Sequence, residues 1–156
     1  MSTYLLTWNP AKWPWEDLTD CIQQIRKTGH YRERWSCGRN RRIVEGDRVF
    51  LLRQGLEPRG IVGSGRVVSE VFDDLHWDEA KRAAGQRVWS VAVDFDTLLD
   101  ADREPILTRA QLKEGVLGHI HWDPQSSGIT VPEEVAKQLE IEWARINRKS
   151  ETRNQK

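Results

Sequence analysis

Gly60-Ile61-Val62-Gly63-Ser64-Gly65-Arg66-Val67-Val68-Ser69 is a β-rich stretch that three glycines interrupt. Glycine inside a strand weakens the strand and usually marks a bulge or a sharp bend. Small barrels bend their strands at corners in this way. The stretch therefore predicts a strongly curved strand. Its Gly63-Ser64-Gly65 run also resembles the start of a dinucleotide fingerprint, but Val68 occupies the place of the third glycine, and we set that interpretation aside.

Further strands and helices are predicted on both sides of this stretch. The apolar run 48–53 lacks alternation, which is typical of a strand covered on both faces. Strands are also expected at 4–7, 88–96 and 129–131, and helices at about 14–28, 108–114 and 132–146. Strands and helices do not alternate as βαβ units. We therefore predict an α+β domain of about five to six strands in a small bent barrel, flanked by two to three helices.

Composition limits the function. The 156 residues fit one domain, and 24 Lys and Arg balance 24 Asp and Glu. A nucleic-acid site would therefore be a local basic patch rather than a general coat of positive charge. The two cysteines form neither a disulfide framework nor a metal-spaced set. Without a signal peptide or a long apolar run in the sequence, we expect a cytoplasmic protein that does not contact membranes.

The clearest local asymmetry surrounds Arg34-Trp35-Ser36-Cys37-Gly38-Arg39-Asn40-Arg41-Arg42. Residues 26–42 contain seven cationic side chains and one carboxylate, Glu33. An indole can stack on a base, small residues let the backbone approach the base edge, and arginines can bind the flanking phosphates. The alternative that these residues leave open is a buried Trp35 beside a solvated basic loop. The high Trp count, eight in all, favours a binding surface.

We find no convincing catalytic or metal-binding constellation in the sequence. His119 and His121 lack further ligands, and neither a Walker loop nor the Pro-Cys-x-x-Cys motif of zinc deaminases occurs. Cys37 lies among arginines, which lower a thiol pKa, but we interpret it as a small residue packed beside Trp35. We therefore predict a binding domain that has no enzymatic activity, no cofactor and no metal.

Four blocks, 4–10, 35–39, 46–53 and 60–65, together resemble the EVE domain of the PUA-like superfamily. They are most similar to the EVE modules that precede an HNH nuclease in bacterial modification-dependent restriction enzymes. The resemblance places an EVE domain at 1–146. It leaves 147–156 as a disordered polar tail or the start of a linker.

The resemblance implies a PUA-like bent β-barrel that flips a modified base into an aromatic cage. For this branch the expected ligand is double-stranded DNA that contains 5-methylcytosine or 5-hydroxymethylcytosine. The sequence contains no HNH motif, so we expect this chain to bind and not to cut, with an HNH nuclease, fused or separate, as a partner. The alternative is a PUA-like module that binds modified or unpaired RNA bases.

A 5-methyl group adds only about 1 kcal/mol of apolar burial. Flipping costs a few kcal/mol, and stacking returns about 1–3 kcal/mol per base. Stacking on a single ring therefore does not offset the cost of flipping the base.

The predicted base pocket has Trp35 as one wall and four candidates for a second wall. Two polar residues bind the base edge, one residue accepts a hydrogen bond from the cytosine amino group, and the small Cys37 completes the pocket. The second-wall candidates are Trp8, Tyr31, Trp77 and Trp122, the edge residues Asn9 and Ser36, and the acceptor Asp123. The predicted contacts to the nucleic-acid backbone are Arg32, Arg34, Arg39, Asn40, Arg41 and Arg42. We expect Trp89 and Trp143 in the core, and Trp13 and Trp15 packed at a helix start.

Overall fold

A computed structural model describes residues 1–154 of the chain, and the side chains of residues 1–148. Strands and helices follow the order β1 (Thr3–Trp8), α1 (Leu18–Thr28), β2 (Tyr31–Gly38), β3 (Arg48–Arg53), β4 (Gly60–Val67), β5 (Phe72–Leu75), α2 (Glu79–Ala83), β6 (Arg87–Leu98), β7 (Leu107–Thr108), α3 (Arg109–Leu112), the 3₁₀ helix η1 (Gly115–His119), β8 (Ile129–Val131) and α4 (Glu133–Asn154).

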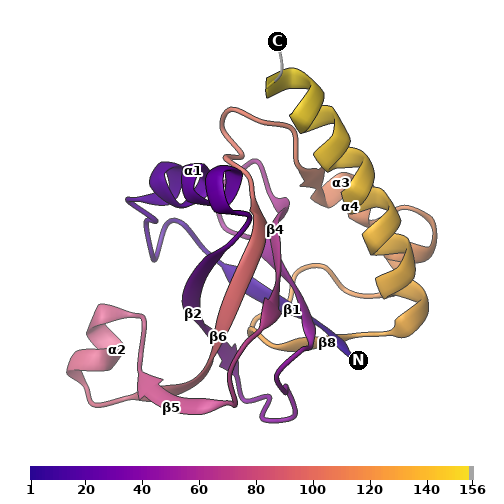
Figure 1. Cartoon of the computed structure of the whole chain (residues 1–156). Coiled ribbons are helices and arrows are strands. Elements are labelled where there is room, and N and C mark those ends of the chain that lie inside the picture. The colour runs from indigo at the N-terminus through magenta and orange to yellow at the C-terminus, as the bar shows by residue number, and fades with distance from the viewer. Residues whose placement is uncertain (155–156) are drawn as a thin grey trace.

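The strands form one curled, eight-stranded sheet in the order β2-β6-β4-β3-β1-β8, with β5 beside β6 and β7 beside β4. Strands β1 and β3 pair in parallel, and the other pairs are antiparallel. Figure 1 shows α1 across one end of the sheet, α4 along its outside, and β5 with α2 projecting from it. This arrangement confirms the predicted α+β domain with a bent sheet.

The glycines of β4 produce the predicted bend. The register shifts between Leu51 and Leu52 on the β3 side of β4, and between Ser64 and Gly65 on the β6 side. A Cβ atom at Gly65 would lie 2.5 Å from the carbonyl oxygen of Asp94 in β6. The strand therefore bends at positions where the neighbouring backbone leaves no room for a side chain.

The central strand β3 is buried on both faces, as its apolar run predicts. Phe50 is fully buried, and its ring lies 6.3 Å from that of Trp143 on α4. The neighbouring Val49 and Leu51 point to the opposite face and are also fully buried. Apolar residues of the core thus pack on both faces of the sheet, inside the curl and beneath α4. This position confirms Trp143 as a core residue.

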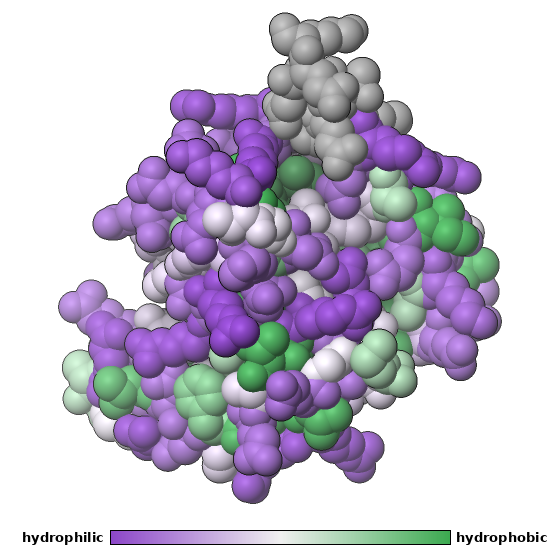
Figure 2. Space-filling view, in the orientation of Figure 1, coloured by the Kyte–Doolittle hydropathy of each residue, from purple (hydrophilic) through white to green (hydrophobic). Residues whose placement is uncertain are grey.

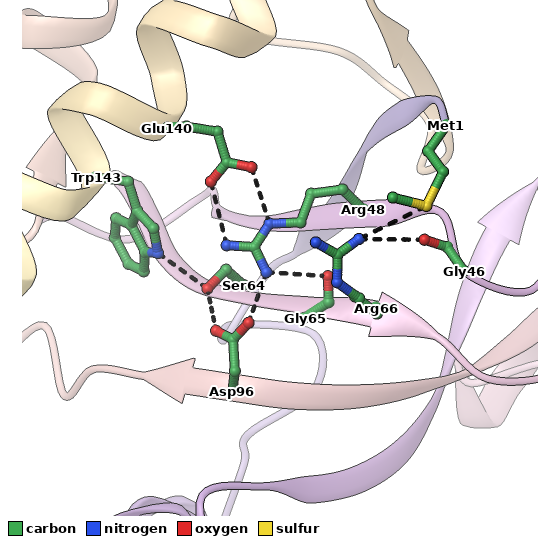
Figure 3. A network of polar contacts seen from close by, with 9 residues as sticks. All are labelled: Met1, Gly46, Arg48, Ser64, Gly65, Arg66, Asp96, Glu140 and Trp143. Carbon is green, nitrogen blue, oxygen red and sulfur yellow. Dashed lines mark hydrogen bonds and ion pairs between the residues drawn. The ribbon is translucent and has the colours of Figure 1, made fainter.

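A polar network attaches α4 to the sheet (Figure 3). The Arg48 guanidinium donates to both carboxylate oxygens of Glu140, at 3.1 and 3.2 Å, and to Asp96 at 2.6 Å. The Ser64 hydroxyl donates to the other oxygen of Asp96 at 2.6 Å and accepts a bond from the Trp143 indole at 2.9 Å. Burial alone would raise the pKa of Asp96, but Ser64 and Arg48 together hold that pKa below its ordinary value.

Some elements differ from the predictions. Residues 31–38 form a complete strand, β2, and the additional short strands β5 and β7 bring the number of strands within residues 1–154 to eight. Trp89, expected in the core, is only half-buried, because it lies near the start of β6 at the surface, where the Arg41 guanidinium rather than an apolar side chain covers its ring. Helix α4 continues to Asn154, past the expected boundary at Ile146. The tail or linker at 147–156 stays a prediction, and residues 155–156 lie outside the described residues.

Within residues 1–154, no helix combines the length and the apolar character that crossing a bilayer requires.

Substitution of Arg48 by Met should lower the free energy of unfolding by about 1–3 kcal/mol at pH 7, because two carboxylates lose charged hydrogen bonds. Urea unfolding measures this loss. Arg145→Met is the matched control, since its partner Glu142 lies on the same helix and the pair is exposed, and it should cost about 0.5 kcal/mol or less.

Comparison of wild type with Arg48→Met also tests the pKa of Asp96. A lowered pKa in the folded state stabilises the fold above the ordinary value of 3.8, and that stabilisation is lost as the pH falls through the folded pKa. The difference between wild type and Arg48→Met should therefore narrow in acid. A difference that stays constant down to pH 2 would contradict this account.

Candidate functional site

Strand β1 lacks a strand neighbour along part of one edge, and this gap is the centre of the candidate site. Strand β8 pairs only with Thr3–Leu5, so in the described part of the chain no strand pairs with Leu6–Trp8 on that side. The Thr7 N–H donates to Ser127 Oγ at 3.1 Å, and the Thr7 carbonyl accepts a bond from Trp35 Nε1 at 2.8 Å. We call the contact between β1 and β2, at which the Trp35 side chain meets the backbone of Thr7, the seam.

Two glycines close one end of the seam. Gly38 at the end of β2 and Gly128 before β8 both have positive φ, 62° and 86°. A Cβ atom on Gly38 would collide with the Ser127 carbonyl, and one on Gly128 with the Cys37 carbonyl. Asn40 Nδ2 donates to the Gly128 carbonyl at 2.7 Å, and its Oδ1 accepts the Arg42 N–H at 2.9 Å. The predicted phosphate ligand Asn40 thus uses both side-chain polar atoms to hold the loop.

Gly128→Ala should destabilise the protein by about 3 kcal/mol or more, because left-handed backbone strain and a backbone collision add together. Gly85→Ala is the control, since Gly85 has a φ of 81° but open space around the added Cβ. That variant should lose only about 1 kcal/mol. Thermal or urea unfolding of the two variants measures the difference, and equal losses would show that the close contact at the seam is unimportant.

Four indoles pack together above the seam. Trp35 lies 5.4 Å from Trp13 and 5.2 Å from Trp15 between ring centroids, and Trp15 lies 5.7 Å from Trp8. The Trp8 indole donates to the Trp13 carbonyl at 2.8 Å. Trp8, Trp15 and Trp35 are buried, whereas Trp13 is half-buried. The predicted wall residues Trp8 and Trp35 are therefore brought together, and the helix-start residues Trp13 and Trp15 join them.

A cleft of about 410 Å³ opens beside this cluster. Its walls are the loop that carries Trp13 and Trp15 on one side and Trp77 with nearby residues of α2 on the other. Trp77 is exposed, with 40% of its surface accessible. Figure 2 shows a mainly hydrophilic face on which apolar residues gather in the lower part, where Figure 1 places β5 and α2. Trp77 thus supplies an accessible ring opposite the indole cluster.

Other predicted pocket residues are engaged elsewhere. The Trp122 indole is buried and donates to the Leu117 carbonyl at 2.7 Å. Asp123 accepts two bonds from Arg109, at 2.7 and 2.5 Å, and these bonds lower the pKa of its carboxyl. The Tyr31 hydroxyl donates to Glu33 at 3.0 Å, and burial raises its pKa. The role of Trp122, Asp123 and Tyr31 in a base pocket stays a prediction, and the contacts that these side chains make inside the protein do not favour it.

Ser36 and Cys37 lie on opposite faces of β2. Cys37 is fully buried, and burial raises the pKa of its thiol to about 11. A thiol with this pKa is protonated at neutral pH and is a poor nucleophile. Ser36 alternates with Trp35 along the strand, so its side chain points away from the face that carries the indole. Within the described residues, no group of three or more His, Cys, Asp or Glu is placed to hold a metal ion.

The arginines predicted to contact the nucleic-acid backbone divide into those with a partner in the described part of the protein and those without one. Arg34 pairs with Asp74 at 3.2 Å, and the Arg41 guanidinium lies 4.1 Å above the Trp89 ring. Arg32, Arg39 and Arg42 are exposed, and within the described side chains none of them forms an ion pair. The loop after β2 therefore presents free positive charge next to the seam, which a phosphate can neutralise.

Sequence reasoning missed Trp13, Trp15, Ser127 and Gly128 as members of the site. The Trp13-Pro14-Trp15 spacing was a detectable signal, because two indoles around a proline exceed what a helix start requires. Ser127 and Gly128 gave no signal of their own, since their role depends on the contact with β2.

Comparison with known proteins identifies the family. The model of the EVE domain family matches residues 2–142. The chain therefore belongs to the EVE domain family, and its PUA-like α+β fold is the one that the sequence resemblance implied. No curated protein sequence matches the chain significantly.

Several solved structures share the fold. A hypothetical protein from Leishmania major is 18% identical, with a TM-score of 0.64 over 93% of this chain and 96% of that chain. A Pseudomonas putida protein is 19% identical, with a TM-score of 0.57 over 90% and 98%. Human THYN1, in complex with 5-methylcytosine-containing DNA, is 18% identical, with a TM-score of 0.57 over 89% and 95%.

Proposed function

We propose that this chain binds DNA that contains 5-methylcytosine or 5-hydroxymethylcytosine and accepts the modified base, flipped out of the duplex, at the seam. The observation that carries the proposal is the indole cluster at the seam, which lies beside an open cleft. The exposed residues Arg39 and Arg42 belong to the loop that Asn40 attaches to Gly128 at the end of the seam. The human THYN1 structure with 5-methylcytosine-containing DNA supports the choice of ligand.

Trp35 and Trp77 are the two walls of the proposed base site. Trp35 provides a fixed ring, because its Nε1 is bonded to the backbone of β1. Trp77 provides a ring on the projecting β5–α2 segment, at the far side of the cleft. Stacking on two rings can offset the few kcal/mol that flipping costs, since each contact is worth about 1–3 kcal/mol.

In this proposal Asn9 binds the base edge. It follows Trp8 at the end of β1, and its Oδ1 accepts the Ala11 N–H at 3.0 Å. Within the described residues, its Nδ2 donates to no other group. A side-chain amide with free N–H groups can donate to the O2 or N3 acceptor of cytosine.

The loop 39–42 binds the flanking phosphates in this proposal. Arg39 and Arg42 are exposed and unpaired among the described side chains, and Arg41 is held against Trp89. Stacking fixes the Arg41 side chain while leaving guanidinium N–H groups at its edge. The further part of the proposal, an HNH nuclease that acts with this module in a restriction system, is supported by the sequence resemblance alone.

Trp77→Ala should reduce the preference for a 5-methylcytosine duplex over a plain duplex by about tenfold, because one stacking wall is lost. A titration at fixed salt against matched duplexes with cytosine, 5-methylcytosine or 5-hydroxymethylcytosine measures the preference. The fold should be unaffected, since Trp77 is exposed. Leu75→Ala, an exposed apolar change in the same segment, is the matched control and should leave the preference unchanged.

Arg42→Ala should change the affinity for DNA and not the preference for the modified duplex. It should weaken binding of modified and plain duplexes alike and reduce the slope of affinity against salt by about one. RNA strands of the same sequence test the alternative ligand class. An unchanged preference in Trp77→Ala, or stronger binding to the RNA, would contradict the proposed function.

A further inference from the structure

The face of Trp35 that the proposed function needs is covered by another side chain. Only 8% of Trp35 is accessible. Three rings lie against it: Trp13 with centroids 5.4 Å apart, Trp15 at 5.2 Å and Phe95 at 6.2 Å. Trp15 and Phe95 are buried, whereas Trp13 is half-buried and lines the cleft, so Trp13 is the ring on the solvent side. A base cannot stack on a surface that another ring already occupies. Either the base never reaches Trp35, or the half-buried ring on the solvent side, Trp13, leaves first.

The contacts of Trp13 allow its side chain to leave without unfolding the loop. The backbone is anchored at both polar groups, because the Trp13 N–H donates to the Asn9 carbonyl at 3.0 Å and its carbonyl accepts from Trp8 Nε1 at 2.8 Å. The indole N–H of Trp13 donates to no group among the described residues. The half-buried ring is thus held by packing, including ring contacts with Trp15 and Trp35. Rotation about its side-chain bonds breaks none of the backbone anchors.

The cleft beside the cluster gives the displaced ring somewhere to go. Trp13 lines this cleft of about 410 Å³, and Trp77 lines it too. That volume lies within the range of about 300–1,000 Å³ that small-molecule sites occupy. The cleft is therefore large enough to take an indole that turns outward, or a base that enters while the indole turns.

We propose that Trp13 is a removable cover of the base site, which rests on Trp35 in the DNA-free protein and gives up that place to the flipped base. This inference rests on the proposed function and adds a regulated entry to it. If only the molecules with Trp13 turned away can bind the base, the apparent affinity equals the intrinsic affinity multiplied by the fraction of such molecules. Removal of the cover should therefore strengthen binding, although Trp13 is one of the aromatic residues around the site.

The test compares two tryptophans that line the same cleft. Trp13→Ala should bind the 5-methylcytosine duplex about 2–10-fold more tightly than wild type, the range that one edge-to-face ring contact provides. The gain should appear in the association rate. Trp77→Ala should bind the same duplex more weakly. Trp13→Phe, which keeps a smaller ring, should fall between wild type and Trp13→Ala, and thermal unfolding of each variant establishes that it is folded.

Each outcome decides the proposal. Tighter and faster binding by Trp13→Ala supports the cover, and so does a preference for modified DNA that appears only in this variant. Weaker binding by folded Trp13→Ala or Trp13→Phe, with the wild-type preference present, shows that Trp13 is a wall and overturns the cover alone. Unchanged binding also overturns it. No preference for modified DNA in any of the proteins overturns the proposed function and the cover together.

Discussion

The hydrogen bond from the Trp35 indole to the Thr7 carbonyl is the contact on which the candidate site depends. It joins β2, the strand at one end of the curled sheet, to β1, which is next to the last strand β8 at the other end, and these two strands do not pair with each other. A buried backbone carbonyl without a partner costs about 1–3 kcal/mol. An indole that supplies this partner is therefore fixed in position, and its ring becomes a rigid surface rather than a mobile side chain.

The neighbouring loops keep this surface close to the exterior. Gly38, Gly128 and Asn40 bring the end of β2 against the segment before β8, so the seam closes just beyond Trp35. The loop from β1 to α1 lies on the other side and adds Trp13 and Trp15. Away from the seam, the Arg48 network attaches α4 to the sheet. The site thus consists of a rigid interior wall, a loop that covers it and a projecting segment that carries Trp77.

Much of the fold could be predicted from local patterns. The glycines of β4 and the unbroken apolar run of β3 indicated a bent strand and a doubly buried strand, because both patterns report burial and steric room directly. Trp35 stood out because a ring, small residues and arginines are adjacent in sequence. The Trp13-Pro14-Trp15 spacing marked these two indoles as unusual, but their contact with Trp35 could not be read from it, since that contact depends on how a loop folds back over the sheet. For Trp122 and Asp123, the residue type alone did not indicate the partners, Leu117 and Arg109, with which these side chains form hydrogen bonds.

The most direct measurement is a crystal structure of the chain bound to a short duplex that contains a single 5-methylcytosine. The account predicts that this base lies outside the helix between Trp35 and Trp77, with Trp13 turned away and the loop 39–42 against the neighbouring phosphates. A base that stays stacked in the duplex, or DNA bound on a face remote from the seam, would contradict it.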